Sequence, residues 1–328
     1  MVTQAQIAEQ LGVSRQLVTF ALSGHPHVAE SSRELILAKA KEMGYRPNPY
    51  ARALKRKKTG IVALWIPDQV SGHFGNVSRN LTQLVKESGH ELIVAEIGGR
   101  DVNQVWSNVP VDGIFAIDNG NLSESEFDSL AGNTVPIVGL GAYYSEKFDS
   151  IQVDLATGAA EAMKHLLDSG YKRIAHATFI DKDLPNASRR REYSNAMREA
   201  GLPPEFIIYP FSENQRAVTR QLIQEYIADH GLPEAIFCHS DDAALGIYRG
   251  LCDLKIRVPD QVALVGCDGI EDTMYLEVPL STLVQPVKEM CSKAWQFLKD
   301  RMDDPSLPPR HVSLPPRLDI RDSSRRPS

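Results

Sequence analysis

The sequence predicts an α/β protein with a small helical domain at its N-terminus, and three observations lead to this prediction. Residues 3–58 carry helical patterns without a strand pattern. From Ile61 onward, continuous apolar runs alternate with amphipathic stretches, which is the pattern of parallel strands joined by crossover helices in doubly wound sheets. About ten strand candidates are too many for one small domain, so we expect two lobes.

The first helices of the chain are expected between Thr3 and Ser23, where two short helical patterns flank a tight turn. Thr3 and Gln6 have the spacing of a capping box, and Gly12 ends the first helix because glycine readily adopts the left-handed conformation. Ser14 caps the second helix. Arg15, Gln16 and Thr19 then point outward near its start, where a helix-turn-helix places the residues that read base edges in the major groove.

A third helix and a short fourth helix are expected before the first strand. Ser31 or Ser32 caps the third helix, and Gly44 ends it. The prolines at 47 and 49 allow a short helix over 49–54 that fades in Lys55–Lys58. A helix of this length is not stable alone in water, so we expect it to fold only on a partner.

From residue 61 onward the alternation predicts a full set of strands and helices. We predict strands at 61–66, 91–95, 113–117, 135–139, 151–153, 173–178, 206–209, 235–238, 262–265 and 281–284. The helices between them are expected at about 75–88, 123–131, 156–169, 187–200, 214–230, 241–254 and 287–302.

The charge of the chain is divided unevenly. The net charge is −6 over 328 residues, but residues 1–60 hold ten Lys and Arg against four Glu, a net charge of +6. The rest of the chain therefore carries −12. A basic N-terminal segment on an acidic remainder is expected if only that segment meets nucleic-acid phosphates.

Composition argues for a globular protein of the cytoplasm. Hydrophobic residues make up 42% and charged residues 24%, which is ordinary. No apolar run reaches the roughly 18 residues that cross a bilayer, so no membrane partner is expected, and no apolar signal core precedes the first helix. The four cysteines lack CxxC spacing, which favours reduced thiols over a zinc site.

Motifs for catalysis and cofactors are missing from the sequence. GLGAYY at 139–144 lacks the third glycine of a dinucleotide fingerprint. There is no P-loop, no GxSxG and no HExxH, and the nine histidines show no metal-ligand spacing. We therefore expect no enzyme, no cofactor and no metal.

Several motifs in order resemble the LacI/GalR family of transcriptional regulators. The N-terminal match is IAEQLGVSRQLVTFALSGHPHVAESSRELILAKAKEMGYRPNPYARALK. Downstream matches are HLLDSGYKRIA at 165–175, SRRREYSNAMREAGL at 188–202, VGCDG at 265–269 and PLSTLVQP at 279–286. The resemblance covers essentially the whole chain. It implies a helix-turn-helix head, a hinge helix and a two-lobed body like a periplasmic binding protein.

The resemblance also implies domain boundaries. The head would span 1–46, the hinge helix and linker 47–59, and the effector-binding and dimerisation body 60–328. Lobe 1 would hold about 60–169 and 286–312, and lobe 2 about 170–285 and 313–328, with three crossings between the lobes. The family binds small ligands between its lobes, at the carboxyl ends of strands.

By the same resemblance, the head carries the DNA contacts. Arg15 and Gln16 fall at base-reading positions, where Arg suits guanine and Gln suits adenine. The family often has Arg at the position of Phe20, which either touches a thymine methyl or packs internally. Backbone contacts with a capping or loop alternative are Thr3, Ser14, Thr19, Ser23 and His27. Tyr50, Ala51 and Leu54 match the hinge helix in the minor groove, with Leu54 as the wedge that kinks the duplex.

The resemblance assigns the effector site to fewer residues. Arg189 matches the ligand-gripping arginine and Asp268 the aspartate after the VG strand; together they suit a polyhydroxylated ligand. Ser240 and Asp241 stand where the family often has Asn-Asp. Aromatic and loop candidates are His73 and Phe74, in the loop after the first strand, and Phe179.

The resemblance thus implies a homodimeric repressor that reads a pseudo-palindromic operator and senses a sugar or sugar derivative. One alternative is a sugar-binding transport protein of the same body fold, which would need a signal peptide and would lack residues 3–58. A second alternative is a regulator that answers to a protein partner instead of a ligand.

Overall fold

The structure, a computed structural model, describes residues 2–45, 58–67, 70–97, 110–117, 135–141, 146–179, 187–210 and 214–326. The chain divides into two compact units, Met1–Thr59 and Gly60–Ser328, which we call the head and the body. The expected hinge helix with Tyr50, Ala51 and Leu54 lies outside the described residues, as does the expected helix at 123–131.

The head contains three helices among its described residues: α1 (Gln4–Leu11), α2 (Arg15–Leu22) and α3 (Glu30–Glu42). Their shared core is formed by fully buried side chains such as Ile7, Val18 and Ile36. The capping box of Thr3 with Gln6 is present, and Gly12 adopts the left-handed conformation with φ +63°. The predicted helix-turn-helix is therefore confirmed.

The predicted cap of the third helix is wrong. α3 begins at Glu30, with Ala29 as its N-cap residue and no side-chain cap. The carbonyl of Ala29 already accepts hydrogen bonds from the backbone N–H groups of Ser32 and Arg33. Ser31 and Ser32 therefore lie inside the first turn of the helix. They are past the N-cap position, so their hydroxyls do not cap the helix.

The described strands of the body form two sheets, and all but one neighbouring pair is parallel. The first sheet has the order β11-β5-β4-β3-β1-β2. Its strands are β1 (Ile61–Ile66), β2 (Glu91–Glu96), β3 (Gly113–Ile117), β4 (Ile137–Gly141), β5 (Asp149–Val153) and β11 (His311–Leu314). We call the first sheet and the helices on it lobe 1.

The second sheet has the order β12-β10-β9-β8-β6-β7, and only β12 runs antiparallel, against β10. Its strands are β6 (Ile174–Thr178), β7 (Glu205–Ile208), β8 (Ala235–Cys238), β9 (Ala263–Asp268), β10 (Ser281–Val284) and β12 (Arg317–Asp319). This sheet and its helices form lobe 2, so the predicted α/β fold with parallel, doubly wound sheets is confirmed.

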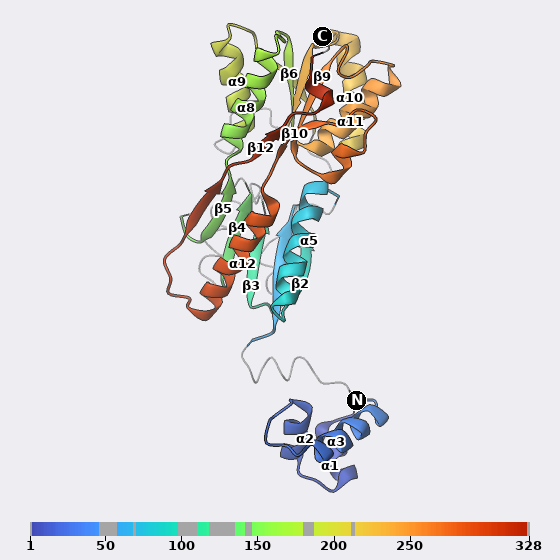
Figure 1. The fold of residues 1–328 in the computed structure, drawn as a ribbon, viewed down its shortest axis with the longest axis vertical. Helices are drawn as coiled ribbons and strands as arrows, with labels where there is room; N and C mark the ends of the chain where they lie inside the picture. Colours follow the sequence, from blue (N-terminus) through green and yellow to red (C-terminus); the bar gives the residue numbers. More distant parts are fainter. Residues whose placement is uncertain are drawn as a thin grey trace. The chain divides into compact units, whose positions relative to one another are not determined.

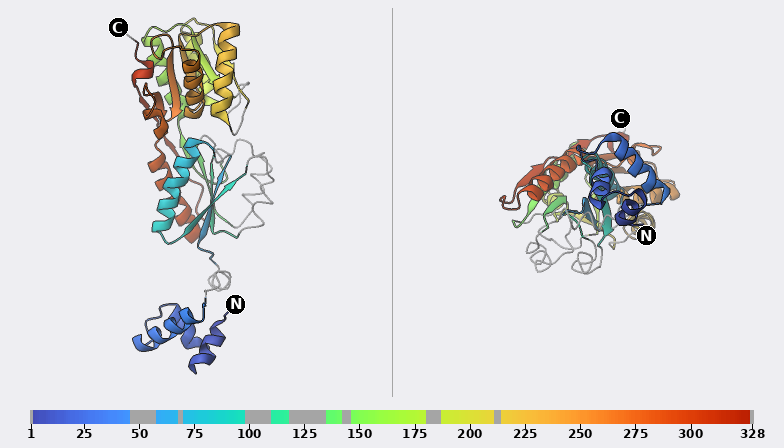
Figure 2. Two further views of the ribbon diagram at one scale, coloured as in Figure 1. Left: turned by 90° about the vertical axis from the view of Figure 1, so that its right-hand side faces the viewer. Right: turned by 90° about the horizontal axis from the view of Figure 1, so that it is seen from below.

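Helices cover both faces of the second sheet (Figure 1). On one face lie α8 (Leu155–Asp168) and α9 (Ser188–Glu199), and on the other α10 (Gln215–His230) and α11 (Asp241–Asp253). Alternate strand residues belong to the two cores: Phe237 packs on the α8 side, and Ile236 and Cys238 on the α11 side. On the first sheet, α5 (Gly72–Glu87) and α12 (Val287–Asp303) lie side by side (Figure 2).

The chain passes between the two sheets three times: after β5, after β10 and between β11 and β12. These crossings are close together, because a Cβ on Gly158 would lie 2.6 Å from Pro316 and 3.3 Å from Leu283. α8 contacts α9, β8, β10 and β12, so it belongs to lobe 2. Our assignment of residues 155–168 to lobe 1 is therefore wrong: the first crossing falls at Asp154, directly after β5.

Two short 3₁₀ helices complete the described secondary structure, at Glu271–Met274 and Asp322–Ser324. Within the described residues, no helix is both long enough and apolar enough to cross a membrane.

Candidate functional sites

The first candidate site lies at the N-terminal end of α2 in the head. Ser14 caps the helix: its Oγ accepts a hydrogen bond from the backbone N–H of Leu17 at 3.1 Å. Arg15 and Gln16 are the first two residues of the helix, and both are exposed. Their side chains are therefore available to a ligand beside the positive end of the helix dipole.

Other predicted DNA contacts in the head already make internal hydrogen bonds. The Thr19 hydroxyl donates to Gln4 Oε1 at 2.8 Å and lies 3.0 Å from the carbonyl of Arg15. The Ser23 hydroxyl donates to the carbonyl of Phe20 at 3.2 Å. Thr3 is part of the capping box. These bonds are the local roles expected of hydroxyl side chains at helix ends, and contacts of the same residues with DNA stay a prediction.

Phe20 packs inside the head. Its ring is stacked on His25, with the centroids 4.5 Å apart and the planes at 20°. It also packs against the helical core, and it is half-buried. His27 is exposed, and its ring centroid lies 5.3 Å from that of His25. Of the two roles considered for Phe20, internal packing is therefore the one present in the isolated chain.

The second candidate site lies at the carboxyl edge of the second sheet. Because β6, β8, β9 and β10 are parallel, the residues that end or follow them lie along one edge. These residues are Phe179, His239, Asp268 and Gln285. The ring of Phe179 meets the ring of His239 edge to face at a centroid distance of 4.5 Å.

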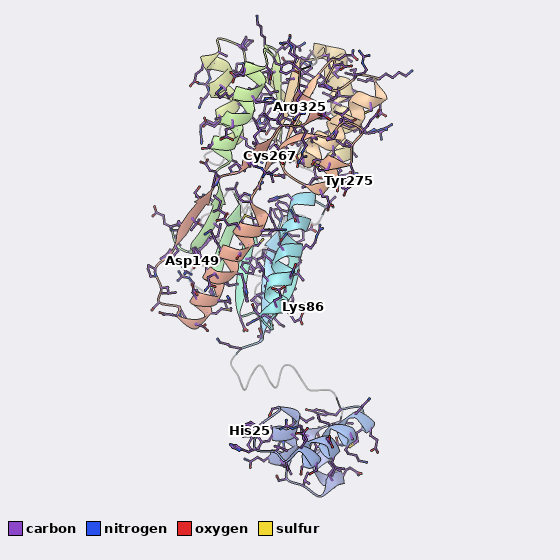
Figure 3. All side chains as sticks on the ribbon, viewed as in Figure 1. His25, Lys86, Asp149, Cys267, Tyr275 and Arg325 are labelled. Carbon is purple, nitrogen blue, oxygen red and sulfur yellow. The ribbon has the colours of Figure 1, made fainter. Side chains whose placement is uncertain are left out.

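Arg189 reaches across this edge from the first turn of α9. Its guanidinium donates to the carbonyl of His239 at 2.7 Å, and its other terminal nitrogen lies 2.7 Å from His239 Nε2. It also lies 3.5 Å from the thiol of Cys267, which Figure 3 labels on β9. The positive charge of Arg189 also acts on the carboxyl group of Asp268 and lowers its pKa, which burial raises more strongly.

Asp268 has a strained backbone at this edge. Its φ of +130° is in a region that residues with a side chain rarely adopt, and its side chain is almost fully buried. Gln285 Nε2 donates to Asp268 Oδ1 at 2.8 Å, and the Gln285 backbone N–H donates to the Asp268 carbonyl. Strain of this kind, held by the surrounding bonds, is typical of functional sites.

Asp241 lies beneath the edge and supports it. Its carboxylate accepts hydrogen bonds from the backbone N–H groups of Gly269 (2.7 Å) and Ile270 (2.9 Å) and from the Thr282 hydroxyl (2.6 Å). It is fully buried, and burial next to Asp268 raises its pKa. These bonds hold the turn after β9. In this structure Asp241 therefore stabilises the backbone next to Asp268.

Ser240 also has a local role. It is the N-cap residue of α11, its Oγ accepts from the backbone N–H of Ala243 at 3.2 Å, and it donates to Gln215 Oε1 at 3.0 Å. The position that often holds Asn in the family is therefore used here as a helix cap.

His73 and Phe74 lie in the first turn of α5, not in a loop. We expected the helix to start near residue 75, but it begins at Gly72. The first backbone N–H groups of a helix have no acceptor within the helix. Here the Gly72 N–H donates to the Asp242 carboxylate of lobe 2 at 3.0 Å, which makes the earlier start possible. His73 is buried, and its ring lies edge-on to Phe74 at 5.7 Å. Phe74 also packs against the core of the body.

Two residues with evident roles here, His239 and Asp242, were not among the predicted site residues; the sequence suggested only a structural or pocket-lining role for His239. His239 binds the proposed ligand-gripping arginine, and Asp242 joins the two lobes. Both flank the Ser240-Asp241 pair in the run HSDD at 239–242. The only signal was this density of polar residues directly after a buried strand, the place where α/β proteins gather functional groups.

Comparison with protein families and curated proteins gives consistent results. A family model described as periplasmic binding protein-like domain matches residues 163–324. Catabolite control protein A of Priestia megaterium is 28% identical over 339 residues and covers 99% of both chains. The ribose operon repressor of Haemophilus influenzae is 28% identical over 332 residues and covers 98% of both chains.

Solved structures share the fold. A lac repressor dimer bound to operator and an anti-inducer has a TM-score of 0.81 at 20% identity, and the match covers 98% of this chain and 99% of that one. A transcriptional regulator CelR–cellobiose complex has a TM-score of 0.67 at 22% identity and covers 98% and 100%. A LacI family regulator from Enterococcus faecium with bound ribose has a TM-score of 0.72 at 22% identity and covers 80% and 98%.

A helix-turn-helix head and a two-lobed body with a polar edge of this kind define the class of protein: a DNA-binding regulator with a periplasmic-binding-protein-like body. Its relatives over nearly the full length include a ribose operon repressor and an HTH-type transcriptional repressor. In sequence and fold the chain is similar over nearly its full length to repressors and to a LacI family regulator.

Proposed function

We propose that the protein is a sequence-specific DNA-binding repressor whose affinity for its operator is controlled by a small carbohydrate-like effector. One observation carries this proposal: a single chain joins exposed Arg15 and Gln16 at a helix N-terminus to a body with Arg189 and Asp268 at one sheet edge. The first pair suits bases, and the second suits the hydroxyl groups of a sugar.

Charge supports the proposed DNA contact. Residues 1–60 carry a net charge of +6 on a chain with −6 overall, so phosphates attract the head rather than the body. Arg15 and Gln16 would each contribute about 1–3 kcal/mol of discrimination against a wrong base. Backbone contacts would come from Thr3, Ser14, Thr19, Ser23 and His27, with the hinge residues Tyr50, Ala51 and Leu54 in the minor groove.

Two copies of the chain would read the two halves of a pseudo-palindromic operator. The similar lac repressor was solved as a dimer on its operator, which supports a homodimer here. Relatives are named as a ribose operon repressor and as an HTH-type transcriptional repressor, which supports regulation rather than catalysis. Work on chromosomal DNA would place the protein in the cytoplasm.

The effector would bind at the carboxyl edges of the sheets, where the two lobes meet. Arginine and aspartate can each make paired hydrogen bonds with vicinal hydroxyls, and Phe179 offers an aromatic surface for a sugar face. Regulators of similar fold were solved with ribose, cellobiose and lactose, which supports a carbohydrate without choosing one.

Effector binding would act on DNA through the orientation of the lobes. The hydrogen bond from the Gly72 backbone N–H to Asp242 joins them directly. A ligand with a different affinity for two lobe orientations would shift their populations, and a coupling of about 1–3 kcal/mol suffices for switching.

The experiment that tests this proposal selects DNA with the full chain from a randomised duplex library. We expect enrichment of a pseudo-palindromic sequence and, in anisotropy measurements on that sequence, loss of at least about tenfold in affinity for Arg15→Ala or Gln16→Ala. The exposed α3 residue Glu34 provides the control Glu34→Asp, which keeps the charge of the head and should bind normally. A selection that enriches nothing over the starting library would contradict the DNA-binding role.

A panel of sugars distinguishes the proposal from its alternatives. The panel holds pentoses, hexoses and disaccharides, including ribose, cellobiose and lactose, and a rise in the melting temperature of the protein with any of them supports a sugar effector. Operator binding without any sugar response would point instead to a protein partner. Sugar binding without any selected DNA sequence would point to a transport protein.

A further inference from the structure

His239 stands at the centre of the sheet edge that carries Arg189. It follows β8 directly, it is only 5% exposed, and residues of two other elements surround it. Thr178 ends β6, Phe179 follows β6, and Arg189 is the second residue of α9. His239 is thus a buried polar ring placed between a strand end and a guanidinium.

The hydrogen bonds of His239 determine which ring nitrogen carries the proton. A guanidinium can only donate, so His239 Nε2, at 2.7 Å from Arg189, must be the unprotonated acceptor. The proton is then on Nδ1, which lies 3.3 Å from Thr178 Oγ1 and donates to that hydroxyl. The chain of bonds therefore runs from Arg189 through His239 to Thr178.

The surroundings keep this ring neutral. Burial lowers the pKa of His239 well below its ordinary value of 6.5, and the positive charge of Arg189 lowers it further, as does the nearby His176. Other ionisable groups at this edge include Cys267, next to the guanidinium, Asp268 and the neighbouring Asp241, and Tyr209 beside Phe179. A second proton on His239 would remove the acceptor that Arg189 uses and place two cations together.

We propose that His239 is the positioning residue for Arg189: its neutral ring, held by Thr178, fixes the guanidinium at the carboxyl edge of the second sheet and thereby sets the affinity for the effector. This inference rests on the proposed function for its effector part. The pairing itself rests on the geometry alone. Arg189 also donates to the His239 carbonyl, which keeps the guanidinium at this edge. The contribution of the ring is therefore to orient the guanidinium.

Three variants separate a positioning role from a merely structural one. His239→Leu fills the space but removes the acceptor, and should weaken the binding of the best sugar at least about tenfold, which corresponds to about 1.4 kcal/mol. His239→Gln can place its Oε1 near the position of Nε2 and should restore most of the affinity. Thr178→Val keeps the shape of the strand residue and removes the acceptor of Nδ1 while leaving the His239 ring in place, so it should give an intermediate loss.

The matched control is His90→Gln, at the amino end of β2, away from the carboxyl edges. All variants should keep operator affinity and the melting temperature without sugar. A His239→Gln variant as weak as His239→Leu, or a His239→Leu variant with unchanged sugar affinity, would overturn the positioning role.

A second readout needs no effector. Full-length protein labelled with ¹⁵N-histidine should show a ring with protonated Nδ1 and unprotonated Nε2 from pH 8 to 5 that disappears in His239→Gln and shifts in Arg189→Ala. The buried His176, whose Nδ1 lies 2.9 Å from the carbonyl of Phe237, should give a second signal of this kind, which stays in His239→Gln. A His239 ring with protonated Nε2 would overturn the pairing. If the His239 signal appears while no sugar binds the wild type, the pairing stands, and the sugar part of the proposed function fails.

Discussion

Asp242 in lobe 2 accepts a hydrogen bond from the backbone N–H of Gly72 in lobe 1 at 3.0 Å, across 170 positions of sequence. The same carboxylate accepts from Arg216 Nε at 2.7 Å, and Arg216 also pairs with Asp272 at 2.9 Å. A Cβ on Gly72 would lie 2.9 Å from Ile270 Cδ1. One carboxylate thus receives a helix N-terminus from one lobe and an arginine from the other.

Asp242→Asn should loosen this junction. The amide keeps the shape but loses the charge that attracts Arg216 and the positive end of α5. We expect the sugar concentration for half-release of the operator to change at least about threefold, because the balance of lobe orientations changes by a fraction of the 1–3 kcal/mol typical of coupling. Fluorescence anisotropy of the selected operator, titrated with sugar, measures this half-release concentration.

The control for this junction is Asp253→Asn. Asp253 lies on the same helix and pairs with Arg220 and Arg249, both on lobe 2. It should leave the half-release concentration unchanged. Equal behaviour of the Asp242 and Asp253 variants would argue against a junction at Asp242.

Ser14→Ala should destabilise the head by about 1 kcal/mol, because the backbone N–H of Leu17 loses its acceptor. The paired variant Ser31→Ala removes a hydroxyl that is not a cap in this structure and should have almost no effect. Urea unfolding of the isolated head, followed by circular dichroism, distinguishes them. Similar losses in both variants would show that Ser31 also supports α3.

Operator binding should weaken steeply with salt. The head carries ten basic residues within 1–60, and a protein that contacts about six phosphates loses about 10³-fold in affinity or more between 50 and 200 mM salt. Anisotropy titrations over this range provide the slope. Sugar binding to the body, measured in parallel, should change little, and a flat DNA slope would contradict recognition by a basic head.

Asp149, which Figure 3 labels in lobe 1, is the first residue of β5 and accepts bonds from two arginines. It is fully buried and pairs with Arg301 at 3.0 Å and Arg310 at 3.2 Å. Burial raises its pKa, but the hydrogen bonds from the two arginines outweigh burial and lower the pKa below the ordinary value of 3.8. The stability that this lowering gives is present above the ordinary pKa and is lost as the pH falls through the lowered one.

Asp149→Asn should therefore cost about 3–5 kcal/mol of unfolding free energy at pH 7, because two arginines lose a buried partner. The difference from wild type should shrink below about pH 4. The control Asp168→Asn breaks an exposed pair with Lys164 and should cost less than about 1 kcal/mol. Denaturant melts at several pH values test both, and a difference that grows toward acid would contradict the sign.

The head and the central strands could be predicted because their signals are local. Thr3 and Ser14 start α1 and α2, Gly12 ends α1, and each acts within three or four residues along the chain. The short strands β11 and β12 were not predicted, because they depend on distant partners: Val312 pairs with Ile151, and Leu318 with Leu283. The place of α8 was wrong for a related reason, since an apolar helix face does not indicate which of two sheets it covers.

The resemblance predicted individual residues of the candidate sites, but not the contacts between them. Arg189 and Asp268 lie at the expected edge, but the partner of Arg189, His239, depends on β8 and α9 meeting in space. The position of His73 and Phe74 was wrong because the start of α5 depends on Asp242 in the other lobe. Contacts between lobes have no signature in a single sequence.

The central claim is that one chain couples a sugar site to an operator site, and one titration tests it most directly. Sugars are added to a preformed complex of the full chain and its selected operator, with anisotropy as the readout, for wild type, Arg189→Ala and the control Arg191→Ala, which changes an exposed residue of the same helix. We predict that at least one sugar lowers operator affinity about tenfold for wild type and Arg191→Ala, and that Arg189→Ala binds the operator normally without responding. An operator complex that no sugar changes, or a response that Arg189→Ala retains, would contradict the account.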